Sequence, residues 1–288
     1  MTATLPLPLP HPTTATGSRF RGARRRERGF TLIEIAIAVF IIALLLSSIL
    51  VPLHTQVEQR QVSETQKTLE DIKVALISHA VTKGYLPCPD RTTVGGGGAN
   101  DTANDGVEDF DAATGFCLGS LAGTWTVPPA AGNTRRAVGN VPWVTLGLGA
   151  ADPWGNRFRY ANDMEFSGRS PAAGTPFSLA SWADLGVCTS QACTTRLTST
   201  TAGEAAVAVI LSHGKNGYYA INITGATNPI NTSADESDNT GGSTYTSRPT
   251  YRPTSSAPAE LAKEFDDVVI WLGKYTLYQR MVAAGKLP

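Results

Sequence analysis

Four cysteines are the first residues of this 288-residue sequence whose type and spacing could do chemistry. In an oxidising compartment an even number of cysteines forms disulfides, and four cysteines allow three pairings. Short loop closure favours the local pairing, Cys88 with Cys117 and Cys188 with Cys193. A zinc site is the alternative, but the sequence has no C-x-x-C and no nearby pair of histidines. We therefore expect two local disulfides.

Acidic residues gather between the first two cysteines, in the segment DTANDGVEDFD. This segment is similar to a calcium loop with oxygen ligands, because Gly106 permits a sharp turn after Asp105. It departs from the spacing of an EF-hand, since Ala103 stands where a ligand belongs and Ala112 stands at the twelfth position. Two interpretations stay open, a solvated acidic loop and a weak calcium site with Asp101, Asp105 and Glu108 as ligands.

Catalytic residues are not evident in the sequence. None of the four histidines belongs to a serine or cysteine nucleophile arrangement that we can identify. We therefore expect that the chain is not an enzyme and that it needs no cofactor, with calcium as the one open question.

Charge is divided unevenly along the chain, although 24 basic and 24 acidic residues balance overall. Residues 1–29 carry six arginines and one glutamate, which leaves 18 basic and 23 acidic groups for the rest of the chain. A nucleic-acid-binding protein would carry its positive charge on the folded body. We therefore expect no nucleic-acid partner.

An apolar run follows the arginines, and Glu34 is the only charged residue in residues 30–51. A helix of that length covers roughly 33 Å, enough to cross the hydrocarbon core of a bilayer. The positive-inside rule places the arginines in the cytoplasm and the chain after Val51 on the other side. A cleaved secretory signal and a twin-arginine signal are the weaker alternatives, because the run is long and no cleavage site follows it.

Glu34 is unusual in such a span, because an ionised carboxylate in hydrocarbon needs a partner. The segment GFTLIE at residues 29–34, with its basic leader and apolar helix, resembles the class III signal of type IV pilins and type II secretion pseudopilins. The resemblance implies that a prepilin peptidase cuts after Gly29 and methylates the new amino group of Phe30. It also implies that Glu34 pairs with the N-terminal amine of a neighbouring subunit during filament assembly.

The pattern divides the chain into four parts: a removed basic leader at 1–29, a transmembrane and assembly segment at 30–52, an amphipathic helix at 53–84 and an extracytoplasmic head at 85–288. Pro52 is expected to end or kink the apolar helix. Neither proline nor glycine interrupts residues 54–83, and Gly84 is the expected helix stop. Apolar residues recur there at near-helical spacing: Val62, Leu69, Ile72, Leu76 and Ala80.

Short apolar runs between clusters of glycine, proline, asparagine and serine predict a small antiparallel sheet in the head. A loop is expected at 224–258 and a short terminal helix at 274–288. The fold class is α+β and pilin-like, with the long N-terminal helix packed on the sheet. The expected strands are 141–148, 157–161, 204–212, 217–223 and 266–272.

The resemblance implies a minor pilin or pseudopilin, first held in the inner membrane and then part of a periplasmic or surface filament. Its partners would be prepilin peptidase, other pilin-type subunits, the inner-membrane assembly platform and membrane lipid. The DPWG segment at 152–155 resembles major pseudopilins and favours type II secretion, whereas the large head with two disulfides favours a minor type IV pilin. Major pseudopilins hold calcium in the loop before the last strand, where this chain has Asp235, Glu236 and Asp238.

A different class of function stays open as the alternative. The chain could be a membrane-tethered enzyme or ligand-binding module that uses the span only as an anchor. That hypothesis predicts no cut at Gly29, whereas a filament subunit requires one.

Overall fold

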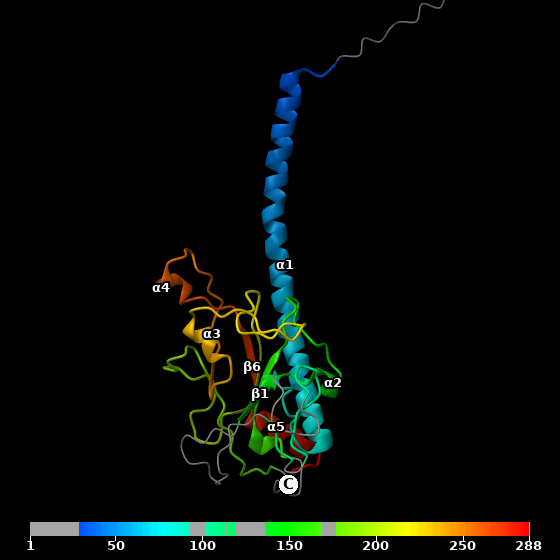
Figure 1. Cartoon of the computed structure of the whole chain (residues 1–288), viewed down its shortest axis with the longest axis vertical. Helices are drawn as coiled ribbons and strands as arrows, with labels where there is room; N and C mark the ends of the chain where they lie inside the picture. Colours follow the sequence, from blue (N-terminus) through cyan, green and yellow to red (C-terminus); the bar gives the residue numbers. More distant parts are fainter. Residues whose placement is uncertain (1–28, 93–101, 113–114, 119–135, 169–176, 288) are drawn as a thin grey trace, which may run out of the picture. The chain divides into compact units, whose positions relative to one another are not determined.

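The computed structural model describes residues 29–92, 102–112, 115–118, 136–168 and 177–287, with the side chains of residues 46–55 excepted (Figure 1). The chain divides into two units, Met1–His54 and Thr55–Pro288. The first helix contributes residues to both units.

Helix α1, Leu32–Lys83, has 52 residues and is the longest element. It runs on through Pro52, because a proline removes one hydrogen bond while the bonds on either side persist. The helix therefore does not end at Pro52. It ends before Gly84, whose φ of +92° is left-handed and whose N–H donates to the Ala80 carbonyl at 2.7 Å.

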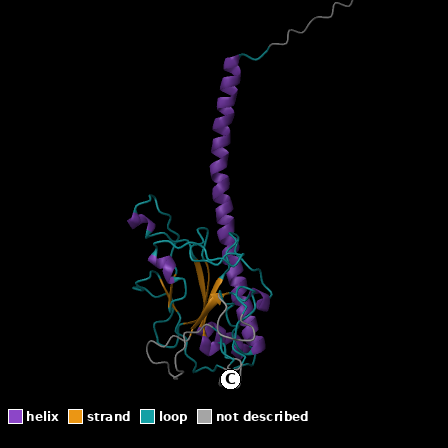
Figure 2. Ribbon diagram, in the orientation of Figure 1, coloured by secondary structure: helices purple, strands orange, loops and turns teal. Residues whose placement is uncertain are grey.

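An antiparallel sheet of four strands forms the centre of the second unit, in the order β1-β2-β4-β6 (Figure 2). A second sheet consists of two short parallel strands, β3 and β5. The α+β prediction with a small antiparallel sheet is therefore confirmed, and the parallel pair was not predicted. The strands are β1 Arg136–Asn140, β2 Arg159–Asp163, β3 Gly186–Cys188, β4 Ala206–Ser212, β5 Thr244–Thr246 and β6 Val268–Gly273.

Both faces of the four-stranded sheet are covered, so every residue of β4 is buried. Ile210 packs on one face in a cluster with the buried stripe of α1 and with helix α5, Lys274–Ala283. Val209 and Leu211 pack on the other face with Val187 of β3 and Tyr245 of β5. The stripe consists of the fully buried side chains Leu69, Ile72, Leu76 and Ala80.

Two predicted strands are wrong. The run at 141–148 forms the short helix α2, Trp143–Leu146, because Pro142 precedes it and Gly147, with φ +68°, ends it. The run at 217–223 forms no strand, because Gly217 and Tyr219 have φ of +60° and +63° and interrupt the extended chain; Ile221 and Asn222 form only isolated bridges.

The other predicted elements lie near those observed. The runs at 204–212 and 266–272 contain most of β4 and β6, β2 begins two residues later than the run at 157–161, and the terminal helix ends at Ala283. Strand β1 was not predicted. The predicted loop at 224–258 holds α3, Ala234–Asp238, and β5, and helix α4, Pro258–Leu261, begins at its end.

Candidate processing site and carboxylate cluster

The N-terminal candidate site lies at the first turn of α1. The Thr31 Oγ1 accepts a hydrogen bond from the Glu34 N–H at 3.3 Å, and the Glu34 carboxylate accepts one from the Thr31 N–H at 3.5 Å. This reciprocal pair is a capping box, which satisfies two N–H groups at the start of the helix. We did not predict this role of Glu34 from the sequence, although T-x-x-E before an apolar run is its signature.

Gly29 and Phe30 precede this cap in exposed, irregular chain. A β-carbon placed on Gly29 would meet no atom within 4 Å, and Phe30 is 77% exposed. The fold itself therefore does not require a glycine at residue 29. A requirement for glycine there would come from an enzyme that reads the segment.

Large apolar side chains at residues 32–45 of α1 are exposed, with exposed fractions from 50% at Ile41 to 90% at Leu32. An apolar surface of this kind is normally covered by lipid or by another protein. No helix within the described residues combines the length and hydropathy that a membrane span needs.

A family model described as the prokaryotic N-terminal methylation motif matches residues 24–50. The chain carries a prepilin-type signal. The matched residues include Gly29, Phe30 and Glu34, and with the α+β fold they are consistent with a pilin or pseudopilin. Such a signal implies processing by prepilin peptidase and assembly with other pilin-type subunits. Neither a curated protein nor a solved structure matches the chain.

The acidic loop between Cys88 and Cys117 is only partly described, and Asp101 lies outside the described residues. The Asp105 carboxylate accepts a hydrogen bond from the Val107 N–H at 2.8 Å, and the Glu108 carboxylate accepts one from the Cys88 N–H at 3.2 Å. In the structure these two carboxylates bind the backbone of their own loop. The calcium prediction for this loop stays a prediction.

A different set of carboxylates forms the candidate metal centre. Glu236, Asp266 and Asp267 have ligand oxygens that all lie within 4.8 Å of one another, the one such group among the described residues. Glu236 comes from α3, and the two aspartates directly precede β6. The donor atoms are all oxygens, which suits calcium or magnesium better than zinc.

Neutral groups hold two of these carboxylates in place. Glu236 Oε1 accepts hydrogen bonds from the Asn216 side chain at 2.9 Å and from the Asp266 N–H at 3.1 Å, and its Oε2 accepts one from Asn231. Asp266 Oδ2 accepts a hydrogen bond from the Asn216 N–H at 2.9 Å, while the buried Asp266 Oδ1 has no hydrogen-bond partner among the residues that the structure describes. Neither carboxylate meets a cationic side chain in the described part of the chain.

Burial and mutual repulsion make the cluster costly to ionise. Burial, followed by the charge of Asp267, raises the pKa of Glu236 to about 8. Burial also raises the pKa of Asp266 to about 7, and the neighbouring Asp267 adds to the effect. These carboxyl groups hold protons near neutral pH unless a cation lies among them.

Among the described residues, Asp267 is the member of the cluster that lies beside a histidine. Its Oδ1 lies 3.5 Å from Nδ1 of the buried His213, and the other ring nitrogen of His213 accepts a hydrogen bond from Arg159 at 3.3 Å. Arg159 thus reaches Asp267 only through the His213 ring. A divalent cation would balance two of the negative charges that the three carboxylates carry when they are ionised.

The second predicted acidic group is separated by the fold. Asp235 pairs with Arg248 Nε at 2.6 Å, and Asp238 accepts a hydrogen bond from the Thr246 hydroxyl at 3.2 Å. Glu236 alone points into the cluster. Asp266 and Asp267 were predicted as the start of a strand. Two adjacent acidic residues directly before an apolar run were the signal that we missed.

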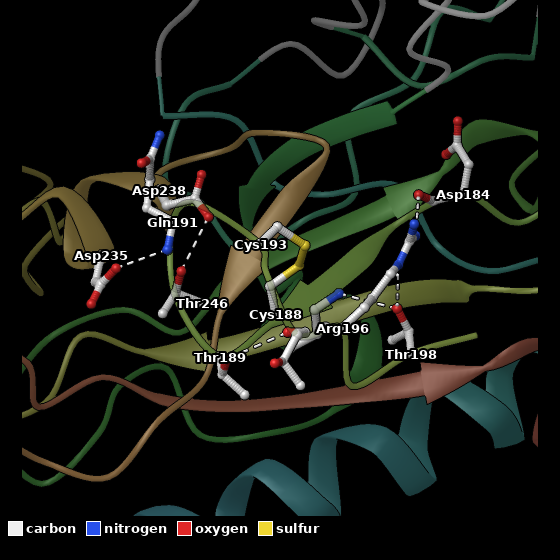
Figure 3. Close-up of a disulfide and its surroundings, with 12 residues drawn as sticks. Asp184, Cys188, Thr189, Gln191, Cys193, Arg196, Thr198, Asp235, Asp238 and Thr246 are labelled. Atoms are coloured by element: carbon white, nitrogen blue, oxygen red, sulfur yellow. Dashed lines mark hydrogen bonds between the residues drawn. A yellow bond between two sulfur atoms is a disulfide. The ribbon is translucent and has the colours of Figure 1, made fainter. Parts of the chain in front are cut away.

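Both predicted disulfides are present, Cys88–Cys117 and Cys188–Cys193. Figure 3 shows the second bond at the end of β3, with Gln191 of its loop facing Asp235. The structure therefore has the local pairing that short loop closure favours.

Proposed function

We propose that this chain is a structural, non-enzymatic subunit, a minor pilin or pseudopilin, that prepilin peptidase cuts after Gly29 and that then joins a filament. The methylation motif at residues 24–50 carries the proposal. The apolar run at 30–51 and its arginine-rich leader support insertion in the inner membrane with an extracytoplasmic head. The exposed apolar side chains of α1 supply a surface for lipid and then for neighbouring subunits.

Processing is tested by the intact mass of the chain recovered from membranes. The wild-type mass should correspond to a chain that starts at N-methylated Phe30. The Gly29→Val variant should keep its leader, because peptidase recognition needs a small residue before the cut. Gly29→Ala is the matched control, since a β-carbon at residue 29 meets no atom of the fold within 4 Å. An uncut wild-type chain would instead support the tethered enzyme or binding module.

We also propose that Glu236, Asp266 and Asp267 hold a hard divalent cation such as calcium, which would stabilise the head. Glu236 is buried and Asp266 is half-buried, and neither has a cationic partner among the described residues, which favours this second function. A ligand present at 100 times its Kd stabilises a folded protein by about 2.7 kcal/mol.

The cation proposal is tested by thermal unfolding with calcium and with a chelator. Calcium should raise the melting temperature of the wild type and leave that of Asp266→Asn unchanged. Asp71→Asn, at an exposed position of α1, is the matched control and should respond as the wild type does. Equal melting temperatures of the wild type in calcium and chelator would contradict the proposal.

A further inference from the structure

The Cys188–Cys193 loop lies against the helix that carries Glu236. The loop turns at Ser190–Cys193, where the Cys193 N–H donates to the Ser190 carbonyl at 2.9 Å. At the tip of the turn the backbone N–H of Gln191 donates to Asp235 Oδ1 at 2.8 Å (Figure 3). Asp235 directly precedes Glu236 in α3.

Helix α3 needs such support because it has only five residues, Ala234–Asp238. A helix this short is not stable on its own, so contacts outside it set its position. Asp235 supplies two of these contacts, one to Gln191 and one to Arg248 at 2.6 Å. The disulfide loop thus helps to fix the segment from which Glu236 reaches the cluster.

A second path joins the same disulfide to Asp267. Cys188 is paired with Thr246 across the parallel strands β3 and β5. The Thr246 N–H donates to the Asn239 side-chain oxygen at 2.8 Å, and the Asn239 amide nitrogen donates to Asp267 Oδ2 at 2.7 Å. Asn239 and Thr246 are fully buried, so this path is shielded from water.

We propose that the Cys188–Cys193 loop positions the carboxylates of the cation site, so that cation affinity depends on this disulfide and on the Gln191 N–H. This inference rests on the proposed cation function. One loop would hold Glu236 through α3 and Asp267 through β5 and Asn239. The disulfide Cys88–Cys117 closes the other acidic loop of the chain and provides an internal comparison.

Gln191→Pro tests the first path with a minimal change. Gln191 is exposed and occupies the second position of the turn, where proline fits and removes only the N–H donor. Gln191→Ala keeps that donor and is the matched control. The paired variants Cys188→Ser with Cys193→Ser, and Cys88→Ser with Cys117→Ser, compare the two disulfides.

The measurement is the Kd for calcium by titration calorimetry of the full-length chain in detergent, with the melting temperature in chelator recorded beside it. Gln191→Pro and the Cys188/Cys193 pair should raise the Kd about ten- to hundredfold, as changes around a metal's ligands do. Gln191→Ala and the Cys88/Cys117 pair should keep the wild-type Kd, even where the melting temperature falls. A merely structural loop would change the melting temperature and not the Kd.

Two results would contradict different claims. If the wild type binds calcium and both Gln191→Pro and the Cys188/Cys193 pair bind it equally well, the positioning role is wrong and the cation site stands. If the wild type releases no heat on titration and does not respond to calcium in thermal unfolding, the cation function fails and the positioning role fails with it.

Discussion

Glu34 shows at the scale of one residue how a local role and an assembly role share a side chain. The carboxylate completes the capping box with Thr31, and in the proposed filament it also pairs with the amine of a neighbouring subunit. Replacement by alanine removes both roles. Replacement by glutamine removes the charge and keeps a capping side chain.

We expect Glu34→Gln and Glu34→Ala both to be processed normally and both to reduce incorporation into filaments, because the charge is the shared loss. The measurement is the amount of each variant in sheared filament fractions, with the processed fraction in membranes as the control. If Glu34→Gln is incorporated into filaments as well as the wild type, the role of Glu34 in assembly is helix capping and not charge pairing.

The buried carboxyl group of Asp90 should make the free energy of unfolding depend on pH. It is fully buried, and burial, followed by the charges of Asp109 and Asp105, raises its pKa from 3.8 to about 7. The unfolded chain loses this proton near pH 4 and the folded chain keeps it to about pH 7. The free energy of unfolding should therefore fall as pH rises through this window, by at most about 4 kcal/mol.

Asp90→Asn should remove that dependence, since the amide keeps an acceptor for the Gly106 N–H and carries no charge. At pH 8 we expect the variant to be more stable than the wild type, by about 2–4 kcal/mol in urea unfolding. Near pH 4 the two should be close. A wild-type stability that rises between pH 4 and pH 7 more steeply than that of Asp90→Asn would contradict the assignment.

At the scale of elements, the two disulfides close loops of different length. They join residues 29 and 5 positions apart in the sequence. By the chain-entropy relation these closures contribute roughly 3.5 and 2 kcal/mol. Cys117→Ser should therefore lower the free energy of unfolding more than Cys193→Ser, in denaturant unfolding of oxidised chains. An equal or opposite order would show that local contacts outweigh loop closure.

Sequence patterns predicted the elements that pack by periodicity and missed those set by contacts distant in the sequence. The stripe of α1 and the continuous apolar run of β4 were evident because each repeats over many residues. The run at 141–148 was predicted as a strand, but it forms a helical turn. Its Val144 and Thr145 N–H groups donate to the carbonyl of Gly106, which is distant in the sequence. The carboxylate cluster was missed for the same reason, because residues 236 and 266 meet only in the folded chain.

At the scale of the whole molecule, the head of the second unit needs the part of α1 that belongs to it. Leu69, Ile72 and Leu76 are fully buried in the same cluster as Tyr160 and Leu272. Burial of three such side chains contributes about 5–9 kcal/mol, while a domain is stable by about 5–15 kcal/mol in all. Loss of the helix would thus remove a contribution as large as the whole free energy of unfolding expected for the head.

A chain that begins at Thr55 should therefore fold with a cooperative thermal transition, and a chain that begins at Tyr85 should not. Both keep the four cysteines and the whole sheet, and the longer one also keeps the salt bridges of Glu58 to Lys215 and Arg252 at the start of the retained helix. Circular dichroism melting of the two oxidised chains is the measurement. A cooperative transition of the chain from Tyr85, at the temperature seen for the chain from Thr55, would show that the sheet closes its own core and that the helix only covers it.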